Sequence, residues 1–285
     1  MTATAMDTLV TASWLIDELK AADDLVVLDC TVFLARTEAG FVSTSGRDAW
    51  AAAHIPGAGF ADLDGDLADP ASNYRYAVPE PDAFAAAMGT LGVGDNSRVV
   101  LYDNNQSMWA ARVWWMLRWI GFDRAAILDG GLKAWEAAGQ PVSGEPSAPP
   151  PATLTARPRP ELIATKADVL AAVGDGTTCL IDALPGAMYR GEVTAYGRPG
   201  HIPGATNRSA SGMLDADTGL FRTLDELRPT FPDDPTARVI TYCGGGIAAS
   251  ADAFILTRLG FTDVAVYTAS LQEWAQDPAA PLVTE

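Results

Sequence analysis

Cysteine, histidine and basic residues are scarce in this chain of 285 residues, and each shortage excludes a class of protein. The three cysteines, at positions 30, 179 and 243, are too few and too far apart for a disulfide framework, and with only two histidines a zinc site is not expected. Lysine and arginine total 19 against 36 aspartates and glutamates, which gives a formal net charge of −17. Because contact with nucleic acid or an anionic membrane needs a basic face, neither is an expected partner.

Long hydrophobic runs are also missing. The most apolar stretch, residues 108–120, carries Arg112 and Arg118 and is far shorter than the ~20 apolar residues of a membrane helix. Residues 1–10 have no basic residue and no long apolar run, so we expect no secretory signal and a cytoplasmic location. The chain does contain 48% hydrophobic residues, at a length that allows two domains of ~150 residues, so it should fold.

The sequence repeats itself. The pentapeptide His-Ile-Pro-Gly-Ala at 54–58 recurs at 201–205, a shift of 147 residues. In each half an apolar run ending in Asp precedes the pentapeptide, and a run ending in Tyr follows it, at 98–102 and 238–242. A helix-like stretch ending in Gly-Phe, a third apolar run and a tryptophan segment then complete each half. The chain is therefore predicted to be a duplicated domain.

A linker separates the predicted domains. Residues 141–160 contain seven prolines and almost no apolar side chains that could enter a core, which is typical of an extended, fairly stiff segment. We therefore expect domains at 1–140 and 161–285. In both, short β-branched runs alternate with helical patterns, which predicts α/β units, each a parallel sheet flanked by helices. The tryptophan-rich helix at 108–120 is expected in the core and domain interface rather than at a dimer contact.

The repeat acts as an internal control, because a feature present in both halves most simply serves the fold. The pentapeptide is interpreted as a turn, with His54 and His201 bonded to nearby backbone rather than acting as bases. The halves differ where the middle strand ends: residues 103–107 are Asp-Asn-Asn-Gln-Ser, whereas 243–248 are Cys-Gly-Gly-Gly-Ile-Ala. Since ligands of open α/β sheets bind beyond the carboxyl ends of the strands, we expect the site there.

Three glycines between a strand and a helix let backbone N–H groups converge on an anion. Cys243 is therefore the candidate nucleophile, and its cradle is the loop of Gly244, Gly245, Gly246, Ile247 and Ala248. A helix N-terminus lowers the pKa of a thiol from about 8.5 into the range of about 3.5 to 7.5, so Cys243 is expected to be substantially ionised at neutral pH. The alternative is a buried, inert cysteine, which is the expectation for Cys30 and Cys179.

The order of these landmarks, from about residue 9 to residue 281, resembles the tandem-domain rhodaneses, the thiosulfate and 3-mercaptopyruvate sulfurtransferases. The resemblance implies an inactive first domain, a catalytic second domain and an active site facing the cleft between them. It also implies a cycle in which Cys243 takes the sulfane sulfur of a small-molecule donor as a persulfide. A thiophilic acceptor such as cyanide, a thiol or a thiol-bearing protein then removes that sulfur. No metal or organic cofactor is implied.

The donor stays open. Thiosulfate enzymes typically carry Arg and Lys after the cysteine, and mercaptopyruvate enzymes carry Gly and Ser. Gly244 and Gly245 resemble the mercaptopyruvate type without its serine, and Ala248 replaces a threonine common to both.

Arginines are needed for an anionic substrate, and Arg190 and Arg198 are the nearest matches to the two substrate-binding arginines of the family. Met188 stands where the first of them usually lies, so Arg190 is alternatively a surface charge. Asp48 and His54 are further candidates near the cleft, although their spacing is shorter than in the mercaptopyruvate enzymes.

Two rival functions keep the same fold. A rhodanese-like phosphatase needs an arginine that closes the cysteine loop, but the next arginine after Cys243 is Arg258, far along the helix. A sulfur-relay or regulatory binding module would load a persulfide once or merely dock, and Asp103 shows that one half already has a non-catalytic form. Turnover separates an enzyme from such a module.

Overall fold

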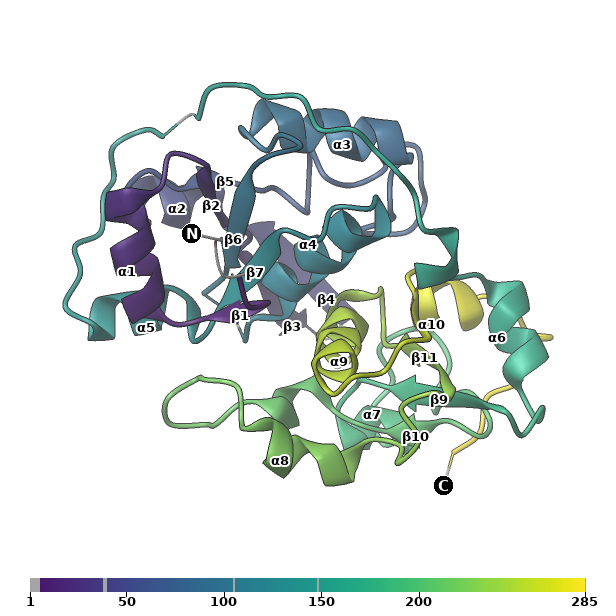
Figure 1. The fold of residues 1–285 in the computed structure, drawn as a ribbon. Coiled ribbons are helices and arrows are strands. Elements are labelled where there is room, and N and C mark those ends of the chain that lie inside the picture. Colours follow the sequence, from purple (N-terminus) through teal and green to yellow (C-terminus); the bar gives the residue numbers. More distant parts are fainter. Residues whose placement is uncertain (1–5, 38–39, 105, 148, 285) are drawn as a thin grey trace.

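The computed structural model describes residues 6–37, 40–104, 106–147 and 149–284, so the first five residues of the N-terminal stretch considered above lie outside it. It contains two α/β units that lie side by side, with the chain termini on different units (Figure 1). Each unit is built on a five-stranded sheet in which all strand pairs are parallel. The predicted α/β class, with a parallel sheet flanked by helices in each half, is confirmed.

The first unit has the strand order β5-β2-β6-β7-β1. Its elements, in chain order, are β1 (Leu9–Val10), α1 (Ala12–Ala21), β2 (Leu25–Asp29), β3 (Val32–Thr37), β4 (Gly40–Ser45), α2 (Arg47–Ala52), β5 (Gly59–Phe60), α3 (Pro81–Thr90), β6 (Arg98–Tyr102), α4 (Met108–Trp119), β7 (Ala125–Leu128) and α5 (Gly131–Ala137).

The second unit has the strand order β10-β9-β11-β12-β8, in which every strand occupies the place of its counterpart in the first. The chain runs through a 3-10 turn (Pro160–Leu162), β8 (Ile163–Ala164), α6 (Lys166–Ala172), β9 (Thr178–Asp182), α7 (Gly186–Tyr189), β10 (Thr206–Asn207), a 3-10 turn (Ala210–Met213), α8 (Leu224–Leu227), a 3-10 turn (Arg228–Thr230), β11 (Arg238–Tyr242), α9 (Ile247–Arg258), β12 (Val264–Tyr267) and α10 (Ser270–Trp274). The identical order confirms the duplication.

The repeated pentapeptide is tied to both sheets by the same contacts. The N–H of Ile55 donates to the hydroxyl of Tyr102 at 3.2 Å, and the N–H of Ile202 donates to that of Tyr242 at 3.0 Å. The Tyr242 hydroxyl in turn donates to the carboxylate of Asp182. These contacts explain why one apolar run in each half ends in Asp and the next ends in Tyr. The two side chains lie at the carboxyl ends of adjacent strands, and the Tyr hydroxyl also binds the pentapeptide.

The two histidines of the pentapeptides bond to backbone. His54 Nδ1 lies 2.6 Å from the carbonyl oxygen of Trp50, and His201 Nδ1 lies 2.8 Å from that of Tyr189. Each ring also stacks on the side chain of the same partner. The histidines therefore hold turns in place, as the repeat predicted.

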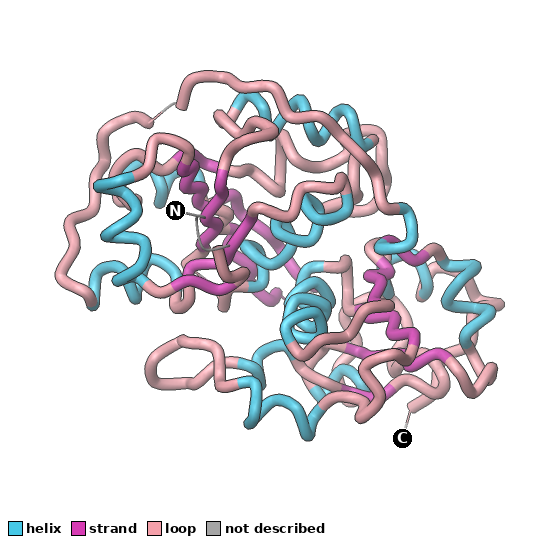
Figure 2. Tube along the Cα trace, in the orientation of Figure 1, coloured by secondary structure: helices cyan, strands magenta, loops and turns pink. Residues whose placement is uncertain are grey.

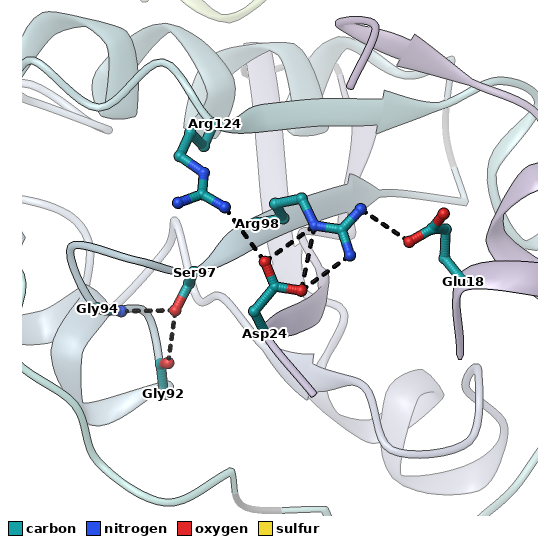
Figure 3. Close-up of polar contacts among 7 residues, drawn as sticks. All are labelled: Glu18, Asp24, Gly92, Gly94, Ser97, Arg98 and Arg124. Carbon is teal, nitrogen blue, oxygen red and sulfur yellow. Dashed lines mark hydrogen bonds and ion pairs between the residues drawn. The ribbon is translucent and has the colours of Figure 1, made fainter. Parts of the chain in front are cut away.

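At the amino edge of the first sheet, ion pairs join neighbouring elements (Figure 3). Arg98, the first residue of β6, contacts Asp24 at 2.8 Å and Glu18 of α1 at 2.7 Å. In the second sheet Arg238 begins β11 and pairs with Asp263. These pairs are partly exposed, so each contributes about 1 kcal/mol or less, and they lie at the end of the sheets away from the candidate site.

The described part of the proline-rich segment, residues 141–147 and 149–159, forms no helix or strand and follows the surface of the first unit past α3 (Figure 1). Its backbone is bonded to that unit, with the N–H of Ala152 donating to the carbonyl of Gly89 and that of Arg157 to Ile120. Leu154 is buried in the core, contrary to the expectation that the segment contributes almost nothing there. Its extended backbone places this side chain against the first unit.

One hydrophobic cluster spans both units, and a second lies within the first unit. Helices α4 and α9 lie against each other at the interface (Figure 2). Trp114 of α4 contacts Phe254 of α9 edge to face, with ring centroids 4.9 Å apart. Trp109, Trp115 and Trp119 of α4 are also buried, in agreement with the predicted core and interface role.

The β3–β4 hairpin is the main departure from the repeat, and the sequence did not predict it. In the second unit β9 leads almost directly into the four-residue helix α7 instead. The hairpin pairs antiparallel along its whole length and projects toward the second unit (Figure 1). Among the helices of the described residues, none has both the length and the apolar character that a membrane crossing requires.

Candidate active site

Cys243 follows the last residue of β11, and the glycine loop carries the chain from it into α9. Cys243 as a whole is only 3% exposed. Its sulfur accepts a hydrogen bond from the N–H of Gly246 at 3.2 Å. Gly246 has φ +82°, a left-handed conformation that glycine adopts without strain, and α9 begins at the next residue. The loop therefore turns its amides toward the sulfur at the start of a helix.

The opposite side of the loop is fixed by α10. The N–H groups of Leu271 and Gln272 donate to the carbonyls of Cys243 at 3.1 Å and Gly244 at 2.9 Å. The N–H of Cys243 donates to the hydroxyl of Ser270 at 3.0 Å. Because the loop carbonyls are bound to α10, they are held away from the space in front of the sulfur.

Ser270 adopts φ +53° although it is not a glycine. Its counterpart in the first unit, 139 residues earlier, is Gly131, which has nearly the same φ of +56°. The serine hydroxyl accepts from Cys243 and donates to the carbonyl of Tyr267 at 2.6 Å. Ser270 therefore keeps a strained backbone conformation that glycine would adopt without strain, and its hydroxyl holds the backbone N–H of Cys243.

The first unit fills the equivalent loop with an anion of its own. Asp103 follows β6 as Cys243 follows β11, and its carboxylate accepts from the N–H groups of Ser107, Trp109 and Ala110 at 2.9–3.0 Å. Three amides at the start of α4 therefore converge on a negative charge. The same backbone design in the second unit suits a negative charge on sulfur.

Burial acts against ionisation of the free thiol. It raises the pKa of Cys243 above its usual value, although hydrogen bonds from the amides of Gly245, Gly246 and Ala249 lower it. Burial therefore opposes the thiolate that the sequence predicts, and the amides of the loop favour it. Cys30 is buried as expected, whereas Cys179 is only partly buried.

The guanidinium group of Arg112 lies next to the glycine loop. Arg112, on α4 of the first unit, has no exposed surface, and its Nη2 donates to the carbonyl of Tyr76 at 2.9 Å. Among the described residues, neither its Nε nor its Nη1 has a hydrogen-bond partner, and Nη1 lies 3.0 Å from where a Cβ on Gly246 would be. Burial lowers the pKa of Arg112 to about 10, and the charge of Cys243 opposes that shift.

The sulfur opens onto a cavity of about 230 Å³ between the units. The first unit supplies one wall, including Leu34 and Phe41 of the β3–β4 hairpin, and the second supplies the other. Most of the lining is apolar: Leu34, Phe41, Tyr76, Met108, Trp109, Ala183, Leu184, Pro185, Met188, Tyr196, Ala210, Ile247 and Ala248. This volume is below the ~300–1,000 Å³ of pockets for drug-sized ligands, so it suits a small molecule.

Neither expected arginine lines this cavity. Arg190 is half-exposed and pairs with Glu192, Nε to Oε1 at 2.7 Å, which supports the alternative of a surface charge. Arg198 donates through Nη1 to the carbonyls of Asp277 and Ala280, both at 2.8 Å, and so fastens the end of the chain.

The other candidates also lie elsewhere. Asp48 is exposed in the first turn of α2, and His54 is buried against Trp50. Arg258 is at the far end of α9 and pairs with Asp7 at 2.7 Å, so it does not close the cysteine loop as a phosphatase would require. Of the residues that the family resemblance singled out near 190, Met188 is the one at the cavity.

Arg75, Tyr196 and Gln272 are among the cavity residues that the sequence reasoning missed. Gln272 exchanges two hydrogen bonds with the backbone of Arg75, at 3.0 and 2.9 Å, and so links the two units at the cavity rim. Tyr196 packs against Gly244 so closely that a Cβ at 244 would overlap its hydroxyl. No sequence motif marks these residues, because each acts through a contact between segments far apart in the chain.

No group of three or more His, Cys, Asp or Glu side chains in the described ranges is arranged to hold a metal ion.

Comparison with known proteins agrees with this geometry. The model of the rhodanese-like domain matches twice, at residues 11–138 and 165–277. The probable 3-mercaptopyruvate sulfurtransferase of Pseudomonas aeruginosa is 35% identical over 270 residues, covering 92% of this chain and 93% of that protein. The thiosulfate sulfurtransferase of Bos taurus is 33% identical over 278 residues, covering 93% and 91%.

Among solved structures, that of SseA from Escherichia coli, described as a 3-mercaptopyruvate sulfotransferase, superimposes with a TM-score of 0.82. It is 30% identical, and the match covers 93% of this chain and 99% of SseA. Two matches to one domain model, and relatives at this identity over nearly the whole length, show that the chain belongs to the rhodanese family as a tandem-domain sulfurtransferase.

Proposed function

We propose that Cys243 carries the transferred sulfur as a persulfide, taking it from 3-mercaptopyruvate or thiosulfate and passing it to a thiophilic acceptor. Relatives named for each of the two donors match this chain to a similar degree. Cyanide and small thiols are suitable acceptors, and a thiol-bearing protein is a further one. The reduced thiol that the cycle needs suits a cytoplasmic location.

In the first half of the cycle the Cys243 thiolate attacks the terminal sulfur of the donor. A sulfur–sulfur bond forms at Cys243, and the bond between that sulfur and the rest of the donor breaks with its electron pair leaving on the donor. Sulfite leaves from thiosulfate, and the enolate of pyruvate, which then takes a proton, leaves from mercaptopyruvate. In the second half the acceptor attacks the outer sulfur, and the electron pair returns to Cys243.

The loop amides stabilise negative charge on sulfur in both states. The observation that carries this proposal is the Asp103 carboxylate, which occupies the matching loop of the first unit and accepts three amide hydrogen bonds there. A loop built in this way is preorganised for an anion, which is electrostatic stabilisation without reorganisation. We accordingly assign catalysis to the second domain, 161–285, and a supporting role to the first, 1–140, with 141–160 connecting them.

The test compares Cys243→Ser with Cys30→Ser. We expect the first to abolish steady-state transfer to cyanide and the second to retain it, because Cys30 is buried away from the cavity. Intact mass after incubation with donor should show one added sulfur atom on the wild type and on Cys30→Ser only. A protein that takes up one sulfur but does not turn over would instead be a sulfur-relay module.

A further inference from the structure

We propose that the cavity selects sulfur donors with an apolar body and at most one negative charge, and disfavours dianionic thiosulfate. This inference rests on the proposed sulfur transfer and concerns which donor enters the same site. Three observations support it. The cavity walls are largely apolar, Arg190 and Arg198 do not line the cavity, and contacts at Gly244 and Gly245 leave no room for basic side chains there.

The walls are apolar on both sides of the sulfur. Phe41, Met108 and Trp109 line the cavity from the first unit, and Leu184 and Met188 line it from the second. Moving an ionised group from water to such surroundings is costly unless it is paired, whereas an apolar group gains about 25 cal/mol for each Å² buried. The walls therefore favour a hydrocarbon or aromatic substituent next to the reacting sulfur.

Charge in the cavity is confined to one side chain. Among the lining side chains that the structure describes, only Arg75 is charged. Its Nη1 donates to the carbonyl of Phe41 at 3.0 Å, its Nη2 contacts the hydroxyl of Tyr76 at 3.3 Å, and Asp64 lies 3.9 Å away. A half-exposed arginine with these partners can still pair with one anionic group, but it cannot compensate two.

The loop itself excludes a further cation. A side chain at Gly244 would overlap the Tyr196 hydroxyl, and a Cβ at Gly245 would lie 3.0 Å from Nε2 of Gln272. Gln272 is held in turn by the backbone of Arg75. The basic residues that suit a dianion therefore have no room at these two positions unless Tyr196 and Gln272 move.

Charge on the sulfur can be stabilised by groups other than the cavity side chains. The N–H of Gly246 donates to the sulfur, and Arg112, which does not line the cavity, lies next to Gly246. They can stabilise the thiolate and the persulfide while leaving the body of the donor in apolar surroundings.

Thiosulfate and benzenethiosulfonate form a matched pair of donors for the test. Both carry a terminal sulfur on a sulfonyl group, and Cys243 attack releases sulfite from one and benzenesulfinate from the other, with the same bonds formed and broken. They differ in that a phenyl ring replaces one charged oxygen. We expect kcat/KM for benzenethiosulfonate to exceed that for thiosulfate by about tenfold or more, with cyanide as the common acceptor.

Met188 offers a variant that reverses this preference. Met188→Arg adds a cation to the wall and is expected to change the ratio of the two kcat/KM values by about tenfold toward thiosulfate. Met188→Leu keeps the wall apolar and should leave the ratio within about threefold of wild type. A wild-type preference for thiosulfate, or an unchanged ratio in Met188→Arg, overturns the inference.

The outcomes also separate this inference from the proposed function. If intact mass shows no added sulfur on Cys243 with either donor, sulfur transfer itself is wrong. If both donors load Cys243 and thiosulfate is the better one, sulfur transfer stands and the donor selection is wrong.

Discussion

Ser270 holds the backbone of Cys243 at a local conformational cost. It is fully buried, has φ +53°, and provides the acceptor for the N–H of Cys243. A left-handed conformation costs a non-glycine residue about 1–2 kcal/mol, and an unsatisfied buried N–H costs about 1–3 kcal/mol. The hydrogen bond therefore offsets the strain, and the two contributions can be separated by substitution.

Ser270→Ala should be less stable than Ser270→Gly. Both variants lose the acceptor for Cys243, but only the glycine relieves the left-handed backbone, so we expect a difference of about 1–2 kcal/mol in the free energy of unfolding. Urea unfolding of both variants measures it. Equal stabilities would show that the backbone at Ser270 is not strained.

Arg112 should set the pH at which Cys243 becomes reactive. The pKa of Cys243 is already raised by burial, so its thiolate fraction grows as the pH rises into the alkaline range. Arg112→Met removes the nearby cation, which should raise the thiol pKa further, by about one unit. At a fixed pH below that pKa, alkylation by iodoacetamide should then be about tenfold slower.

The control is Arg118→Met on the same helix, because Arg118 pairs with Asp123 at 3.6 Å and does not line the cavity. Its alkylation profile should match that of the wild type. Superimposable profiles for Arg112→Met and the wild type would mean that the buried guanidinium does not act on the sulfur.

Among the structural elements, the strand ends carry the contacts that the two halves share. Asp182, the last residue of β9, is buried, and burial raises its pKa to about 6. The N–H of Leu184 and the hydroxyl of Tyr242 donate to it and oppose this shift. The Asp182 carboxyl group therefore links the ends of β9 and β11, and its charged form is destabilised by burial.

The stability contribution of Asp182 should fall as pH rises. A folded pKa of about 6 above the ordinary 3.8 means that the folded state binds the extra proton between these values, so the contribution is complete below about pH 4 and is lost as pH passes 6. The wild type minus Asp182→Asn difference in unfolding free energy should fall by about 2 kcal/mol from pH 4 to 7. Urea unfolding at a series of pH values measures this difference.

Asp175→Asn is the control, because the pKa of Asp175 is shifted in the opposite direction to that of Asp182. Hydrogen bonds from the N–H groups of Thr178 and Thr177 hold the pKa of Asp175 at about 2, so its contribution is present at neutral pH and is lost only as the solution becomes strongly acidic. The wild type minus Asp175→Asn difference should therefore stay constant between pH 5 and 7. A constant difference for Asp182→Asn over pH 4 to 7 would contradict the assignment.

The strands that occur in both halves were predicted from the sequence, whereas the β3–β4 hairpin, which occurs only in the first half, was not. Apolar runs marked β6, β7, β11 and β12, because parallel strands covered on both faces are continuously hydrophobic. The difference between Asp103 and Cys243 pointed to the candidate site, and Cys243 does line the cavity between the units. The β3–β4 hairpin has no counterpart in the other half, and Leu34 and Phe41 reach the cavity only through the docking of the two units. Arg75 and Tyr196 escaped prediction for the same reason.

For the whole molecule, the first unit contributes residues to the candidate site. It supplies Arg112 next to Gly246 of the loop, one wall of the cavity, and the backbone that Gln272 binds. Residues of both halves also belong to one hydrophobic cluster, with Trp114 of α4 against Phe254 of α9. Since docking both builds the cavity and buries the core, we expect the domains to unfold together.

Phe254→Ala tests this coupling with a probe in the other half of the chain. Phe254 is fully buried in the second unit, and its truncation should cost about 3–5 kcal/mol of unfolding free energy. Seven of the eight tryptophans lie at or before position 135, so tryptophan fluorescence reports mainly on the first unit. If the core is shared, the fluorescence transition in urea shifts together with the circular dichroism transition. A fluorescence midpoint that stays at the wild-type value would show instead that the first domain unfolds on its own, and that its contribution to the cavity depends on docking alone.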